Sequence, residues 1–190
     1  MPDRPDIVHE FDWPDRVVVG TVGRPGERTF YLQARTGARS IGVVLEKEQS
    51  AMLAERIDQL LDALSADPAS GVSVPARAPV ELIDDDPLDQ PVEEQFRVGT
   101  MRLSWDPRTA QVVLEAYPLP LPQDEDEDDD GPEPDDDGPD EMLLLRIPVG
   151  TARAFAQRTR QVVHAGRPPC PLCGQPVDPD GHVCALPDGV

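Results

Sequence analysis

Apolar and β-branched residues divide the first part of the chain into short extended stretches. Residues 16–22, 29–35 and 39–45 are rich in valine, other apolar residues and aromatic side chains, and short glycine-containing turns separate them. Such residues favour extended backbone, and short turns join antiparallel neighbours. The pattern predicts a three-stranded antiparallel meander. Residues 9–14 place large side chains ahead of a proline and predict an extended segment that covers a sheet edge.

A helical period follows the third stretch. Apolar residues recur there at the spacing of one helix stripe, at Leu53, Ile57, Leu60, Leu61 and Leu64. We predict a helix over residues 47–65 whose single apolar stripe packs on one face of the sheet.

The same order of elements recurs in the second half of the chain. Residues 95–105 alternate between apolar and polar, with a slip in the alternation that indicates a β-bulge. Residues 111–117 and 142–147 are also strand-like. A second helix is predicted from Thr151, a good N-cap residue, to about His164, just before a glycine.

Short matches between the halves indicate an internal repeat. Val19-Gly20-Thr21 matches Val98-Gly99-Thr100, and the two predicted helices align at a constant offset that places Leu53 opposite Phe155. Chance similarity of two amphipathic helices is the alternative. The sequence thus predicts an α+β fold in which two βββα repeats form one antiparallel sheet with two helices on one face.

Two segments interrupt this order. Residues 66–94 contain Pro, Ser, Asp and Gly with little periodicity, which predicts a long, partly mobile linker. Residues 119–141 predict an acidic disordered insertion within the second repeat. The expected organisation is an α+β repeat domain over residues 1–165 and a C-terminal zinc-knuckle tail over residues 166–190.

The net charge of −20 is concentrated in acidic runs. Residues 81–94 hold seven acids and no base, and residues 124–141 hold thirteen acids and no base. The remaining 17 acids equal the 17 Lys and Arg residues in number. Like charges in a run repel and bury nothing apolar. A solvated insertion is the simplest interpretation, and a contact arm for a basic partner or a mimic of nucleic-acid charge is the alternative.

All three cysteines lie close to the C-terminus, in a pattern typical of a metal knuckle. Cys170 and Cys173 are separated by two residues and followed by Gly174, so that both sulfurs can face one cation. His182 and Cys184 follow, and side chains two apart on an extended segment point the same way. These four residues predict a closed Cys₃His site for a structural Zn²⁺, which would order a tail that has few apolar residues.

Other interpretations of this region remain open. His164 is the competing fourth ligand, although a histidine at a helix end is commonly just a favourable charge. Cys170 and Cys173 could instead form a redox pair, and the site could be catalytic, but no Glu or second His has the spacing of a base. A local basic region beside the tail makes nucleic-acid binding a rival role, and it consists of Arg153, Arg158, Arg160 and Arg167. The net charge of −20 and the few aromatic residues count against that role, and a solvated helix face is the simpler interpretation.

Several strings resemble a known family. They include Arg-Thr-Phe-Tyr-Leu-Gln-Ala-Arg at 28–35, Pro-Val-Glu-Glu-Gln-Phe-Arg-Val-Gly-Thr at 91–100, and the tail at 167–184. In these the chain resembles an uncharacterised bacterial family catalogued as domain of unknown function 3090. The resemblance implies a cytoplasmic protein with no assigned activity, and it carries no catalytic residues.

The favoured function is a cytoplasmic zinc-binding protein that acts as a non-enzymatic protein-interaction or adaptor module. A nucleic-acid-binding or transcription-associated factor is the first alternative. An enzyme of unknown class, using scattered residues such as His9, Asp12 or Glu46, is the second. No apolar run is long enough to span a membrane, and the N-terminus has no apolar signal region, so we expect neither membrane insertion nor secretion.

Overall fold

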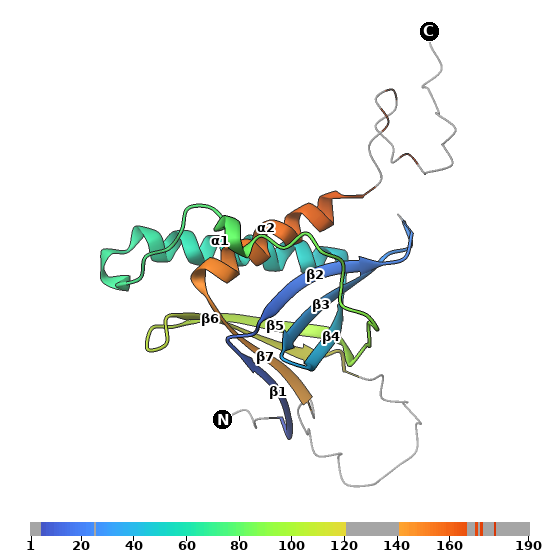
Figure 1. Ribbon diagram of the computed structural model, residues 1–190, viewed down its shortest axis with the longest axis horizontal. Helices are drawn as coiled ribbons and strands as arrows, with labels where there is room; N and C mark the ends of the chain where they lie inside the picture. Colours follow the sequence, from blue (N-terminus) through green and yellow to red (C-terminus); the bar gives the residue numbers. More distant parts are fainter. Residues whose placement is uncertain are drawn as a thin grey trace, which may run out of the picture.

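The computed structural model describes residues 5–24, 26–120, 141–166, 170, 172 and 177. These residues form one seven-stranded sheet and two long helices (Figure 1). The elements in chain order are β1 (Ile7–Asp12), β2 (Arg16–Val22), β3 (Thr29–Thr36), β4 (Arg39–Leu45), α1 (Lys47–Ala66), the 3-10 turns η1 (Pro68–Ser70) and η2 (Val80–Leu82), β5 (Phe96–Asp106), β6 (Gln111–Pro118), β7 (Glu141–Pro148) and α2 (Val149–His164). The predicted mixed fold of one sheet and two helices is confirmed.

The start of α2 differs from the prediction. The N-cap is Pro148, with an extended ψ of 158°, and Thr151 lies inside the first turn. Strand β7 therefore runs directly into the helix, and the fixed φ of proline suits this junction. α1 matches its predicted range closely, and Glu46 and Gln49 form a capping box at its start.

The sheet is mixed, which corrects the predicted antiparallel sheet. Its strand order is β1-β7-β6-β5-β4-β3-β2, and β1 pairs with β7, and β4 with β5, in parallel. A parallel neighbour needs a long crossover. Helix α1 and the segment after it provide that crossover between β4 and β5.

The predicted bulge lies in β5, where the register shifts between Val98 and Thr100. A Cβ on Gly99 would lie 2.8 Å from the Cα of Leu119, so a glycine is required there. The ladders do not place the two Val-Gly-Thr triplets at equivalent positions. Val19 lies opposite Leu32 in the middle of the β2–β3 ladder, whereas Val98 lies opposite Pro118 at the open end of its hairpin. The internal repeat stays a prediction.

The sheet is strongly curled, because its two edge strands are consecutive in the chain. A flat seven-stranded sheet is about 29 Å wide, but the four steps from Asp12 to Arg16 span at most about 14 Å. Phe11 of β1 and Val17 of β2 accordingly lie in the same core. Arg39, the first residue of β4, donates to the carbonyl of Glu10 at 2.9 Å, and its guanidinium lies 4.4 Å from the centroid of the Phe11 ring.

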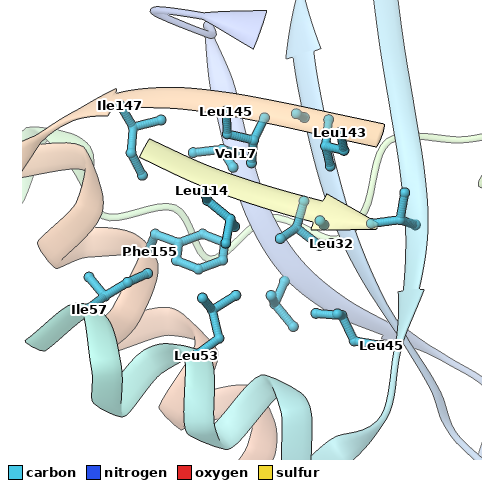
Figure 2. Close-up of a cluster of buried hydrophobic side chains, with 14 of the residues drawn as sticks. Val17, Leu32, Leu45, Leu53, Ile57, Leu114, Leu143, Leu145, Ile147 and Phe155 are labelled. Atoms are coloured by element: carbon cyan, nitrogen blue, oxygen red, sulfur yellow. The ribbon is translucent and has the colours of Figure 1, made fainter. Parts of the chain in front are cut away.

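Both helices cover one face of the sheet, as predicted (Figure 1). Figure 2 shows Leu53 of α1 and Phe155 of α2 pointing towards Leu114 of β6. All three side chains are buried in the main core. Burial of an apolar side chain of this size contributes about 1.5–3 kcal/mol, so each of these three residues stabilises the contact between the helices and the sheet.

Residues 67–95, here named the strap, pack on the rest of the chain and do not merely link α1 to β5. Near the helices, Arg153 donates to the carbonyl of Pro75 at 3.2 Å. On the sheet face opposite the helices, the buried Gln33 side chain exchanges two hydrogen bonds with the backbone of Asp89, at 2.8 and 3.0 Å. The strap thus passes round the β2 edge from one face of the sheet to the other.

Gly20 provides the space that the strap needs. A Cβ at Gly20 would lie 2.6 Å from Cγ of Leu88, which is buried against it. We predict that Gly20→Ala lowers the free energy of unfolding by about 1–3 kcal/mol, because the added methyl displaces Leu88. In a Leu88→Ala background the same change costs much less. Urea denaturation of the four chains measures this, and additive effects would contradict the contact.

Candidate functional site

An arginine–carboxylate cluster joins the strap to the edge of the sheet. Arg16, at the start of β2, pairs with both carboxylate oxygens of Asp84, through Nε at 2.6 Å and Nη2 at 3.0 Å. Its Nη1 also lies 3.0 Å from Asp89, which pairs with Arg35 at 3.0 Å. The carbonyls of Asp86 and Pro87 accept from Arg16 as well. The strap therefore wraps both its side chains and its backbone around one guanidinium group.

Arg158 reaches the same cluster from α2. Its Nε donates to the carbonyl of Val19 at 3.0 Å, on the side of β2 that has no neighbouring strand. Its Nη1 donates to the carboxylate of Asp84 at 2.9 Å and also to the Asp84 carbonyl, and Nη2 donates to the carbonyl of Asp86. Arg158 thus provides a hydrogen-bond partner for a carbonyl of the edge strand β2, and it also fixes the strap.

The electrostatics of the cluster follow from these contacts. The hydrogen bond from Arg16 holds the pKa of Asp84 below its usual value, and the same bond raises the pKa of Arg16. Burial lowers the pKa of Arg158, because desolvation disfavours its charge more than Asp84 favours it. A buried guanidinium needs such partners, and removing one of them leaves an uncompensated charge.

A second cluster ties the helices together. Arg153 of α2 lies 2.7 Å from both Asp58 and Asp62 of α1, and Arg160 pairs with Asp58. The three described arginines of the predicted basic region therefore form ion pairs within the fold. Arg153 and Arg158 are buried and, like Arg160, are neutralised by carboxylates of the same chain. The Arg160 side chain is still 44% exposed, and Arg167 lies outside the described residues.

The scattered residues suggested for an enzyme do not meet in one site. His9 lies 3.0 Å from Glu141, which also accepts from Gln95. Asp12 accepts from Gln111 at 2.8 Å. Glu46 caps α1 and pairs with Arg97 at 2.6 Å. Each of the three suggested residues holds different elements together and shares no partner with the other two.

The predicted acidic insertion is shorter than its predicted range. Leu119 still donates its backbone N–H to Arg97 at 2.8 Å, and Glu141 is already the first residue of β7. Residues 121–140 lie outside the described residues, and so their predicted disorder is not tested.

Of the predicted zinc ligands, the structure describes Cys170 alone. Its side chain is 8% exposed, and its Sγ accepts the backbone N–H of Leu172 at 3.4 Å. Cys173, His182 and Cys184 lie outside the described residues. Within the part of the chain that is described, no group of three His, Cys, Asp or Glu side chains could hold a metal ion.

His164, the competing ligand, has a defined tautomer. Its Nδ1 lies 2.6 Å from the carbonyl of Arg160, which can only accept, so Nδ1 carries the proton. In the neutral imidazole the lone pair is then on Nε2 of this exposed side chain. A ring held in this way is suited to metal binding but does not require it.

Sequence reasoning missed the arginine clusters, although a signal was present. Phe155, Arg158 and Val162 are spaced at i, i+3 and i+7, so Arg158 lies within the apolar stripe of α2. A charged residue within such a stripe indicates a buried ion pair, because an unpaired buried charge is too costly.

The described part of the chain defines a mixed α/β protein with one curled sheet, two helices on one face and a strap held by arginines. Among these residues, no helix is long and apolar enough to cross a membrane. A family model described as "Protein of unknown function (DUF3090)" matches residues 9–184, and the chain belongs to this family. The comparisons with curated proteins and with solved structures found no match.

The lowered pKa of Asp84 predicts a specific acid sensitivity. The contribution of Asp84 to stability is fully present above the ordinary aspartate pKa, about 3.9, and is lost as the pH falls through its lower value in the folded chain. We expect Asp84→Asn to lower the free energy of unfolding by about 3 kcal/mol at pH 7, and this difference to shrink on acidification.

The matched control is Asp85→Asn, which makes the same change of charge at an exposed neighbour. It should alter the free energy of unfolding by at most about 0.5 kcal/mol. Denaturation measured between neutral pH and about pH 3 tests both variants. A difference between Asp84→Asn and the unmodified chain that stays constant over this range would contradict the linkage.

Proposed function

We propose that the chain is a cytoplasmic, zinc-containing protein-interaction module that has no catalytic activity of its own. The observation that carries the zinc part is the contact at Cys170. A backbone N–H directed at a largely buried Sγ, within a Cys-x₂-Cys-Gly string, is what a thiolate ligand of a knuckle needs.

The residues that would hold the ion are Cys170, Cys173, His182 and Cys184. Three thiolates and one imidazole match the preference of Zn²⁺ for soft and intermediate ligands in a closed tetrahedral site. Bound zinc would supply folding free energy to a tail that has little apolar surface to bury. Its role in this proposal is to hold shape.

The interaction role is supported by how the chain uses its polar groups. The arginines and carboxylates of the two clusters fix the strap and the helices, so that a long segment outside the sheet keeps a defined path. A surface ordered in this way loses little conformational entropy when a partner binds. A partner protein therefore fits this architecture better than a small substrate.

The two halves of the fold are further proposed to be repeats of one βββα unit. The alignment that places Leu53 opposite Phe155 also places Asp58 opposite Arg160. These two side chains pair with each other. Residues at equivalent positions meet in this way when two units are related by a two-fold axis. The support rests on the helices, because the Val-Gly-Thr triplets are not equivalent in register.

Metal analysis tests the tail. We expect about one equivalent of zinc per purified chain, and its loss in Cys173→Ser, because three ligands no longer close the tetrahedron. His182→Ala should likewise reduce the zinc content, whereas His164→Ala should leave it unchanged. The reverse result for the two histidines would move the fourth ligand to the end of α2. A metal-free chain with an ordered tail would refute the site.

Affinity capture of the full chain from its native cells tests the interaction role. We expect a partner protein to be recovered at a constant ratio, and to be retained when the elution buffer carries small metabolites. The Met52→Ser variant, which changes an exposed side chain of α1 outside the strap, is the reference for the capture. Failure to recover a constant partner, together with turnover of a substrate by the purified chain, would overturn the non-enzymatic assignment.

A further inference from the structure

The strap presents a short row of exposed apolar side chains, here named the ridge (residues 80–86). Val80 is 80% exposed, Leu82 is 40% exposed and Ile83 is 43% exposed. Three such side chains within four residues form a continuous apolar feature, whereas single exposed apolar residues are ordinary. The ridge is therefore a candidate binding surface. Met52 on α1 is 58% exposed but stands alone, so it is not.

The ridge is held rigidly. The 3-10 turn closes through Leu82 N–H to the carbonyl of Pro79 at 3.0 Å, and Ile83 N–H to the carbonyl of Val80 at 3.3 Å. Leu82 packs against Gly150 at the start of α2. Asp84, the next residue after Ile83, is clamped by Arg16 and Arg158. The apolar row is fixed at both ends before any partner arrives.

One acidic side chain of the ridge points into the fold, and the other three are exposed. Asp84 faces inward and is paired, as described above. Glu81, Asp85 and Asp86 are exposed, and their carboxylates make no ion pair or side-chain hydrogen bond within the part of the chain that is described. No base lies between residues 81 and 94. The apolar row is thus bordered by three exposed carboxylates, of which Asp85 and Asp86 also act at longer range on the charge of Arg158.

From this arrangement we infer that the ridge binds a basic segment of a partner protein that carries apolar side chains on one face. The apolar side chains would cover Val80 and Ile83, and Lys or Arg residues beside them would pair with Glu81 and Asp85. An acidic or an uncharged apolar segment would leave these carboxylates unpaired at the contact. This inference rests on the proposed interaction role and specifies its surface and the chemistry of its partner.

The test uses the full chain and three fluorescein-labelled helical peptides in about 0.1 M salt. The first is an amphipathic helix of leucine and lysine, the second replaces each lysine by glutamate, and the third replaces each leucine by serine. The leucine–lysine peptide should bind most tightly. The serine–lysine peptide reports attraction to the acidic runs in general, and the leucine–glutamate peptide should not bind.

Variants then locate the contact. Val80→Ser with Ile83→Ser should weaken binding of the leucine–lysine peptide about tenfold. Glu81→Lys with Asp85→Lys should weaken it by a similar factor and lower its salt dependence towards that of the serine–lysine peptide. Met52→Ser, which also removes an exposed apolar side chain, should change it less than about twofold. Val80→Ser alone repeats the test if the double variant fails to fold.

Equal binding of the leucine–lysine peptide to the unmodified chain and to both ridge variants would overturn the inference. So would self-association of the chain that is lost in Val80→Ser, because a second copy would then be the occupant. Neither result affects the zinc content or the capture of a partner through another surface. The failure of this inference and the failure of the proposed function can therefore be told apart.

Discussion

The contact of Arg16 and Arg158 with Asp84 is the interaction on which the rest of this structure depends. It joins β2, α2 and the strap at one carboxylate. Each buried guanidinium would be destabilising without its partners, so the strap must take the one path that delivers the Asp84 carboxylate and the Asp86 carbonyl to them. The cover over the β2 edge and the orientation of the ridge are consequences of that path.

This clamp answers a problem that the topology creates. The edge strands β1 and β2 are joined by a short link, which forces the sheet to curl and leaves the outer side of β2 without a strand. Unpaired edge groups need partners, or they invite pairing with another chain. Arg158 satisfies the Val19 carbonyl, and Leu88 covers the strand at Gly20. The Arg158 side chain and the strap thus cover the exposed edge of β2, which in other sheets a further strand would cover.

The distribution of charge bears directly on function. The formal charge of −20 describes an acidic chain, and two arginines of α2, Arg153 and Arg158, are paired within the fold. These two side chains are therefore not free to contribute to a basic surface beside the tail. The acids that remain unpaired on the ridge flank apolar side chains, and this combination is complementary to a basic segment of a protein. The function we propose therefore rests on the difference between the charged groups that are paired within the fold and those that remain exposed.

The sequence by itself determined most of the local elements: the ranges of α1 and of most strands, the bulge in β5, the presence of one sheet with two helices and the family follow from periodicity, turn residues and motif strings. It also specified the cysteine pattern, which is a property of spacing alone. Only the tertiary structure decided the parallel pairings, the curl, the packing of the strap and the burial of Arg158. These depend on partners far apart in the chain, such as Arg158 with Val19 and Gln33 with Asp89, and no local pattern encodes which distant group a side chain will meet.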